Sequence, residues 1–231
     1  MSILADILER ARGTHRAVTI FDLDSTLFST QQRNHTILLE FVAMVGAPQD
    51  LARAVATLGP ADMGWNVIDD LKKRGFTHEP TLQRLRSFWR DRFFRDEYLR
   101  HDLPLPGAVR YVCDLYAAGA TIFYLTGRDE PGMGRGTRAS LSSHGFPLAG
   151  DRIHLRLKPR FEDDDLAFKR RVLLEIRAAG DVVGVFENEP ANANLFAEAF
   201  PAAQVVFLET VHSPNPPPLL PTIARVRDFE R

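Results

Sequence analysis

The sequence predicts an α/β fold in which a parallel β-sheet forms the core and one all-helical segment is inserted into it. Short apolar runs rich in β-branched residues alternate with segments of helical periodicity, which is typical of a parallel sheet covered by helices. The segment 29–103 shows helical periodicity alone, without a convincing strand. We therefore expect a core made of residues 1–28 and 104–231, with residues 29–103 as a separate helical unit.

Composition and charge exclude several classes of protein. The 231 residues are 45% hydrophobic and 26% charged, which is typical of an ordinary globular protein. A formal net charge of −1 gives no global field to attract nucleic acid or an anionic membrane surface. Cys113 is the single cysteine, which excludes an intramolecular disulfide. No segment is apolar enough for a signal peptide or a membrane span, so we expect a cytoplasmic protein with neither membrane nor nucleic acid as a partner.

A short helix and the first strand open the chain. Residues 2–12 carry apolar and charged side chains at helical spacing, and Gly13 follows as a stop. The run Ala17-Val18-Thr19-Ile20-Phe21 is apolar and β-branched, as expected of a strand buried on both faces. We expect the helix to lie against the sheet.

Four helices are expected in the inserted segment, over residues 34–45, 50–58, 62–73 and 79–99. Near the end of the last helix stands an aromatic stripe, which comprises Phe88, Trp89, Phe93 and Phe94. We interpret this stripe as core, because aromatic residues at helical spacing usually pack inward. Trp65 lies in a less regular patch and is the better candidate to face a substrate.

Helices and strands alternate after the chain returns to the core at 103–107. The glycine-rich segment 132–136 lacks the GK[ST] ending of a phosphate-binding P-loop, so we interpret it as a flexible loop. The acidic run 162–165 is interpreted as the start of a helix, where negative charge is favourable. The expected order is helix 108–119, strand 121–125, helix 137–144, strand 153–157, helix 166–179, strand 181–186, helix 192–199, strand 204–208 and an extended proline-rich tail.

Polar residues that could carry chemistry follow the strands. Asp22 and Asp24 come directly after the first strand, where open α/β sheets bind ligands. Two carboxylates this close favour a cation or a shared proton between them. The alternative is a simple Asx-type turn that ends the strand.

A hydroxyl residue ends the second core strand, in the sequence Thr126-Gly127-Arg128. The Thr126 hydroxyl and the neighbouring backbone N–H groups are suited to bind phosphoryl oxygens, and Arg128 adds a charged fork. The alternative for Thr126 is the N-cap of the next helix.

Two lysines and two acids complete the set of candidates. Lys169 stands near the head of helix 166–179, and Lys158 precedes Pro159; either is also suited to a solvated surface position. Glu187 and Glu189 follow the strand 181–186.

These features together resemble the haloacid dehalogenase superfamily, most of whose members are magnesium-dependent phosphatases. The resemblance covers about residues 15–28 and 104–210, and implies a Rossmann-like core with residues 29–103 as a helical cap over the active site. The segments that carry it are Phe21-Asp22-Leu23-Asp24-Ser25-Thr26 for the first motif, Thr126 for the second, Lys169 (preferred) or Lys158-Pro159 for the third, and Glu187-Asn188-Glu189 for the fourth.

The resemblance also implies roles for these residues. Asp22 would be the nucleophile that forms an aspartyl-phosphate, and Asp24 would be the general acid and base. An acid at this second position favours a phosphatase over a dehalogenase, because a halide leaving group needs no proton. The implied contacts to phosphate are Thr126, Lys169, Gly127, Arg128 and Lys158. The implied ligands of Mg²⁺ are Asp22, the backbone carbonyl of Asp24, Glu187 and Glu189, with Asn192 as an alternative to Glu189.

The two glutamates depart from the superfamily pattern, in which these acids are usually aspartates. A glutamate is longer by one methylene, and magnesium requires near-octahedral geometry. This departure motivates a second hypothesis, a non-catalytic or vestigial protein that binds phosphate-like ligands. A third hypothesis is a phosphomutase. In the main hypothesis the protein is a phosphatase whose substrate is a small phosphorylated molecule.

Overall fold

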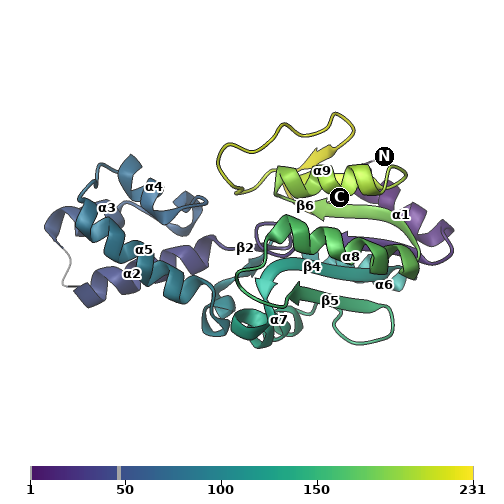
Figure 1. The fold of residues 1–231 in the computed structure, drawn as a ribbon, viewed down its shortest axis with the longest axis horizontal. Helices are drawn as coiled ribbons and strands as arrows, with labels where there is room; N and C mark the ends of the chain where they lie inside the picture. Colours follow the sequence, from purple (N-terminus) through teal and green to yellow (C-terminus); the bar gives the residue numbers. More distant parts are fainter. Residues whose placement is uncertain (1, 46–47, 231) are drawn as a thin grey trace.

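The computed structural model describes residues 2–45 and 48–230, and its core is a parallel sheet of six strands (Figure 1). The strands follow the order β5-β4-β1-β6-β7-β8, and each neighbouring pair is parallel. The α/β fold predicted from the sequence is confirmed. The strands are β1 (Ala17–Phe21), β4 (Thr121–Asp129), β5 (Ile153–Lys158), β6 (Asp181–Glu187), β7 (Gln204–Leu208) and β8 (Ala224–Val226).

Helices cover both faces of this sheet, because each central strand is apolar on both sides. Every residue of β1 is buried, and successive side chains enter two different cores: Phe21 joins one, whereas Val18 and Ile20 join the other. The helices over the first face are α1 (Ile3–Gly13), α6 (Ala108–Ala117) and α7 (Glu130–Ser143); those over the second are α8 (Asp165–Ala179) and α9 (Pro190–Ala199).

The inserted segment forms a helical body beside the sheet, with a core of its own (Figure 1). Leu38 and Phe41 pack in this core with Leu71 and Leu85, all of them buried. None of the helices in the described residues is both long and apolar enough to cross a membrane. The elements of this helical insertion are α2 (Gln31–Val45), α3 (Gln49–Ala56), η1 (Pro60–Asp62), α4 (Val67–Lys73), α5 (Glu79–Phe93) and η2 (Asp96–His101).

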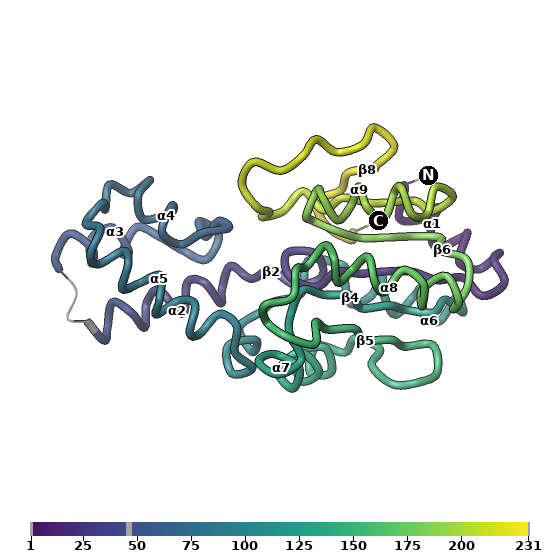
Figure 2. Tube along the Cα trace, in the orientation of Figure 1, coloured from purple at the N-terminus to yellow at the C-terminus, as the bar shows by residue number. Residues whose placement is uncertain are grey.

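Two crossings of the chain connect the helical insertion to the core, and they run side by side (Figure 2). The outgoing strand β2 (Phe28–Ser29) pairs antiparallel with the returning strand β3 (Leu103–Pro104). The backbone N–H of Leu105 then donates to the carbonyl of Leu27 at 2.9 Å. The two ends of the insertion are therefore held together by backbone hydrogen bonds.

The glycine-rich segment 132–136 is helical, so its interpretation as a flexible loop was wrong. The Asp129 carboxylate accepts from the backbone N–H of Gly132 and begins α7 seven residues earlier than expected. At Gly136 an added Cβ would lie 2.5 Å from the backbone oxygen of Asp96. Tertiary packing of η2 against α7 thus overrides the low helix propensity of glycine.

Other boundaries also differ from the prediction: α4 begins at Val67 instead of residue 62, and β4 continues to Asp129. The last helix of the insertion ends at Phe93 instead of continuing to residue 99, and η2 follows it. The proline-rich tail contains one further strand, β8, which adds to the edge of the sheet beside β7. A run of three residues is too short for its periodicity to be read from sequence.

We expect Gly136→Ala to lower the free energy of unfolding by about 1–3 kcal/mol, because the added methyl group meets backbone atoms that cannot rotate away. Gly13→Ala is a matched control, since a Cβ at Gly13 meets nothing within 4 Å. Urea unfolding of both variants measures the difference. Equal stabilities of the two variants would contradict this close packing.

Candidate functional site

Three neighbouring strands bring the predicted acids and the hydroxyl residue to one edge of the sheet. β1 lies between β4 and β6, so Asp22, Thr126 and Glu187 stand at adjacent carboxyl ends. The backbone N–H of Asp22 donates to the carbonyl of Phe186 at 3.0 Å, which continues the pairing of β1 with β6 past the end of the strand. All three side chains are buried.

Lys169 reaches this edge from α8 and joins two of the acids. Its Nζ lies 2.8 Å from Oδ1 of Asp22 and 2.7 Å from Oε2 of Glu187. The side chain of Lys169 is 1% exposed, so its charge is stabilised by these partners instead of by water. The other oxygen of Glu187 accepts from the backbone N–H groups of Asn188 and Glu189, both at 3.0 Å.

The charges in this cluster shift one another's pKa values. Burial raises the pKa of Asp22 well above its ordinary value, and the neighbouring Glu187 carboxylate adds to the rise, against the opposing effect of Lys169. The pKa of Glu187 is raised as well, again chiefly by burial. For Lys169, burial alone would lower the pKa, but the two carboxylates raise it well above its ordinary value. One ammonium group shared by two buried carboxylates accounts for these directions.

Asp24 lies in a second charged cluster, opposite two arginines. Its Oδ1 accepts from Nη2 of Arg33 and from Nη2 of Arg128, both at 2.6 Å. Burial alone would raise the pKa of Asp24, but Arg128 and Arg33 lower it well below its ordinary value. The carboxylate form of Asp24 is therefore strongly favoured in this arrangement.

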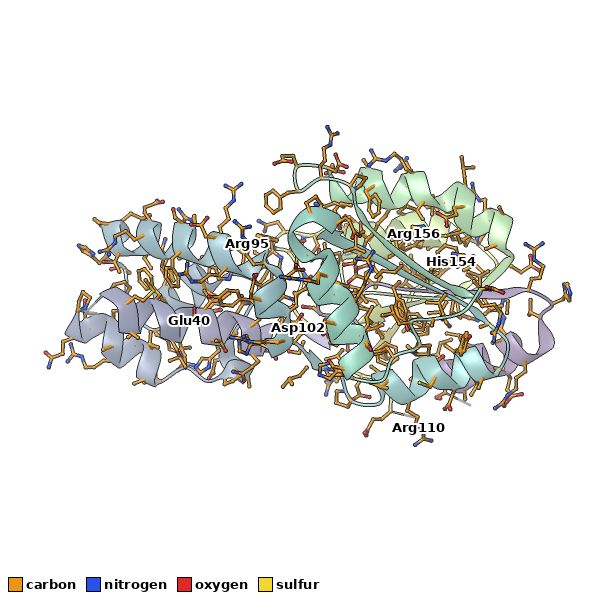
Figure 3. All side chains as sticks on the ribbon, turned by 90° about the horizontal axis from the view of Figure 1, so that it is seen from below. Glu40, Arg95, Asp102, Arg110, His154 and Arg156 are labelled. Carbon is orange, nitrogen blue, oxygen red and sulfur yellow. The ribbon has the colours of Figure 1, made fainter. Side chains whose placement is uncertain are left out.

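Asp102 completes this second cluster at the junction of the helical insertion and the core (Figure 3). Arg33 donates to both of its oxygens, at 2.7 and 2.8 Å, and Nη2 of Arg128 donates at 2.8 Å. Arg33 belongs to α2 in the insertion, whereas Asp24 and Arg128 belong to the core. The cluster of Asp24, Arg33, Asp102 and Arg128, which we call the junction cluster, thus links the two parts through buried charges.

Thr126 and Gly127, the predicted phosphate contacts, lie within β4 just past Tyr124, its last residue paired with β1, and they line the same cavity as Asp22. The hydroxyl of Thr126 accepts from the backbone N–H of Arg128 at 3.3 Å, and Asp129 instead of Thr126 caps the following helix. A Cβ at Gly127 would lie 2.3 Å from Oδ1 of Asp165, so only glycine fits there without a shift of Asp165. Oδ1 of Asp165 is buried and accepts no hydrogen bond from any described residue.

Two further predicted residues have partners other than those expected. The guanidinium of Arg128 donates to Asp24 and Asp102, and its role as a phosphate fork stays a prediction. Lys158 lines the same cavity, but its Nζ donates to the carbonyls of Phe161 and Asp163, at 3.1 and 2.9 Å. The structure thus places Lys169, not Lys158, beside Asp22.

Glu189 is turned away from the other acids. Its Oε1 accepts from the backbone N–H of Ser213 at 2.9 Å, and its Oε2 accepts from the Ser213 hydroxyl at 2.6 Å. In this arrangement the Glu189 carboxylate holds the chain that follows β7, and its role as a metal ligand stays a prediction. Asn192, the alternative, donates to Oδ2 of Asp165 at 3.4 Å.

One cavity of about 440 Å³ extends from these strand ends to the helical insertion. Trp65, Trp89, Phe93 and Phe94 all contribute to its lining. The interpretation of the aromatic stripe as core was therefore wrong for Phe93 and Phe94, which are half-buried at the cavity. Phe88 and Trp89 do pack against the core of the insertion, as expected, and Trp89 lines the cavity as well.

Comparison with solved structures finds similar folds at low sequence identity. Protein tyrosine kinase A of Mycobacterium tuberculosis aligns over 94% of this chain and 95% of its own, with 15% identity and a TM-score of 0.58. A haloacid dehalogenase-like family hydrolase of Streptococcus pneumoniae aligns over 83% of each chain, with 12% identity and a TM-score of 0.51. CbbY of Rhodobacter sphaeroides, in complex with phosphate, aligns over 93% and 94%, with 12% identity and a TM-score of 0.50.

The chain has the haloacid dehalogenase-like fold. No protein-family model matches the sequence, and no curated protein matches it at a significant level. The fold is therefore recognisable from the arrangement of the chain in space, whereas overall sequence similarity is low.

Magnesium is the ion that the haloacid dehalogenase-like fold implies, and the residues at the strand ends fit it. Asp22, Glu187 and Asp165 surround the one ammonium group of Lys169, which leaves negative charge that a divalent cation would balance. The unpartnered Oδ1 of Asp165 is one further oxygen donor. Among the described residues no three His, Cys, Asp or Glu side chains are grouped to hold a metal ion. Magnesium does not require such a group, since it commonly takes one or two carboxylates and keeps several waters.

Sequence reasoning missed three residues of the site. Arg33 and Asp102 are distant in sequence and have no local pattern that distinguishes them from surface charges. Asp165 lies in the acidic run that was interpreted as a helix start; Asp164 does cap α8, and Asp165 lies next to it at the cavity. The one sequence signal for Asp165 was its position at the start of a helix whose amino end lies at the strand ends.

Removal of Arg33 tests the junction cluster. We expect Arg33→Met to lower the free energy of unfolding by about 3–5 kcal/mol, because Asp102 would lose its bidentate partner while remaining buried. Arg110→Met is a control, since the Arg110 side chain is 80% exposed and a change there typically stays within about 0.5 kcal/mol. Thermal or urea unfolding measures both, and equal effects would contradict the arrangement.

Acidification tests the pKa of Asp24. A carboxyl whose folded-state pKa is lowered stabilises the fold above its ordinary value of 3.8, and this stabilisation is lost as the pH falls below that value. We expect the stability difference between wild type and Asp24→Asn to shrink by at most about 1 kcal/mol between about pH 5 and about pH 3, since Asp24 is partly exposed. Urea unfolding at both pH values measures it; a constant difference would exclude the lowered pKa.

Proposed function

We propose that the protein is a phosphomonoester hydrolase that acts through an aspartyl-phosphate on Asp22. The observation that carries the proposal is the position of Asp22 at one end of a cavity, within hydrogen-bond distance of Lys169 and beside Thr126 and Gly127 at the neighbouring strand end. A carboxylate, an ammonium group and a hydroxyl group around one small volume suit a phosphoryl group. The phosphate bound by CbbY, a protein of similar fold, supports the same ligand class.

In the first step, a carboxylate oxygen of Asp22 attacks phosphorus in line. The bond from phosphorus to the ester oxygen breaks, and the leaving alcohol takes up one proton. In the second step, water attacks the same phosphorus, the bond to Asp22 breaks, and inorganic phosphate leaves. Thr126 and Lys169 hold the phosphoryl oxygens through both steps, since both side chains are fixed by burial.

Asp24 is assigned the proton transfers. The two arginines favour its carboxylate form, which is the form that accepts a proton from the attacking water. Donation of a proton to the leaving alcohol requires the protonated form of Asp24. Because the arginines favour the carboxylate form, this step requires weaker contacts between Asp24 and the arginines. Because Arg33 belongs to the helical insertion, a movement of the insertion relative to the core would change one of these contacts.

The groups proposed to hold magnesium are Asp22, the backbone carbonyl of Asp24 and Glu187. When bound there, the ion would reduce the repulsion between the Asp22 carboxylate and the phosphoryl oxygens. The helical insertion is proposed to act as a cap that excludes water and selects the leaving group, because it supplies the aromatic part of the cavity.

Phosphate release from a panel of phosphomonoesters, with magnesium and with EDTA, tests the proposal. We expect turnover that requires the metal and falls by at least about 10³-fold in Asp22→Asn, which removes the nucleophile but keeps the shape of the side chain. Asp151→Asn is the matched control, since Asp151 is exposed and precedes β5 at the end of that strand remote from Lys158. Its activity should equal that of wild type.

The two other hypotheses give different results in the same experiment. A non-catalytic phosphate-binding protein would release no phosphate from any ester, and the observation that favours it is that Ser213 donates to both oxygens of Glu189. A phosphomutase would convert the ester to an isomer, which phosphorus NMR distinguishes from free phosphate. Either result would overturn hydrolysis as the activity.

A further inference from the structure

The helical insertion supplies an aromatic wall to the cavity, made of Trp65, Trp89, Phe93 and Phe94. Three of these residues come from the end of α5 and the residue after it, and Trp65 comes from the turn before α4. The wall shares one cavity with Asp22. A molecule whose phosphate lies at Asp22 would therefore extend toward these rings.

Three rings of the wall, those of Trp89, Phe93 and Phe94, are held in place by contacts with one another. Trp89 and Phe93 stack with centroids 4.6 Å apart, and Phe94 meets Phe93 edge-on at 5.0 Å. The indole N–H of Trp89 donates to Oδ1 of Asn34 at 2.8 Å, which fixes the plane of that ring. The guanidinium of Arg33 lies 4.2 Å from the centroid of Phe93. Preorganised aromatic surfaces of this kind favour flat ligands that can stack or meet them edge-on.

Trp65 is the residue of the wall that packing explains least. It is 50% exposed, although tryptophan is highly buried on average. An exposed tryptophan at the lining of a deep cavity gains burial when a ligand covers it. Trp65 is therefore available to cover a ring of a bound molecule that lies against the rest of the wall.

Charge differs between the two parts of the cavity. The acids at the lining are Asp22, Asp24, Asp165, Glu187 and Glu189, and all of them belong to the core. Arg86 is the one charged lining residue from the described part of the insertion. A neutral ring, or a ring with an anionic group near Arg86 and away from the acids of the core, therefore suits the aromatic part.

From these observations we infer that the substrate is a phosphate monoester whose alcohol carries a flat, neutral or anionic aromatic ring, with the ring held by the aromatic wall. This inference rests on the proposed phosphatase function. A volume of about 440 Å³ suits a ligand of this kind, since pockets for small molecules span roughly 300–1,000 Å³.

The first test compares 2-phenylethyl phosphate with 2-cyclohexylethyl phosphate. The two esters have alcohols of nearly equal size and acidity, so their chemistry is matched and only the flat ring differs. We expect kcat/KM to be about 5-fold higher for the phenyl ester, from the aromatic contacts alone. A merely apolar cavity would take the cyclohexyl ester equally well or better, and that result would overturn the inference.

Variants of Trp65 test whether the aromatic wall causes the preference for the phenyl ester. In Trp65→Leu we expect the ratio of the two kcat/KM values to fall toward one, whereas Trp65→Phe should keep most of it. Leu174→Ala is the control, because Leu174 is 73% exposed on α8 and does not line the cavity. An unchanged ratio in Trp65→Leu would remove Trp65 from the proposal.

A binding measurement separates this inference from the proposed function. Both tryptophans of the chain, Trp65 and Trp89, line the cavity, so tryptophan fluorescence responds directly to a ligand that contacts the aromatic wall. We expect 2-phenylethyl phosphate to quench the fluorescence of Asp22→Asn at lower concentration than the cyclohexyl ester. Preferential binding without turnover by wild type would overturn the phosphatase and keep the ring site. Turnover of both esters at equal kcat/KM would keep the phosphatase and overturn the ring site.

Discussion

The buried ammonium group of Lys169 is the constraint on which the arrangement of the site depends. Parallel strands β1 and β6 end in acids, so their pairing brings two carboxylates, Asp22 and Glu187, into a buried space. Without a cation this arrangement would be costly, since burial and like charge both oppose ionisation. Lys169 supplies that cation from α8, and its two short contacts fix where the helix begins relative to the sheet. The position of Asp165 beside Gly127 follows from the same placement.

The second set of buried charges, the junction cluster, performs a different task. Two arginines and two aspartates neutralise each other, so the cluster adds no net charge to the cavity. It joins residues from both crossings of the chain with the end of β4, and so determines how the helical insertion meets the core. Replacement of any one member leaves one unbalanced charge among the remaining three, which is more costly than the loss of a surface ion pair.

Sequence reasoning located the strands and the polar residues after them, because local periodicity and composition indicate both features. It could not place Arg33 opposite Asp102, since the two are far apart in the chain and meet only in the folded protein. The glycine-rich part of α7 was missed because close packing at Gly136 outweighs helix propensity. The aromatic stripe of α5 was misread for a further reason. Periodicity shows that a helix face is apolar, but not whether that face meets a core or a cavity.

The pairing of β2 with β3 also bears on how such a protein can diversify. Because the outgoing and returning chains are hydrogen-bonded neighbours, the helical insertion begins and ends at nearly one place on the core. A segment with adjacent ends can be lengthened, shortened or exchanged for another without moving the strands that carry Asp22 and Glu187. Under the proposed function, the part that would contact the leaving group is thus free to change under selection, while the part that would carry the nucleophile stays constant. One core can in this way give rise to relatives that differ in ligand and share their chemistry.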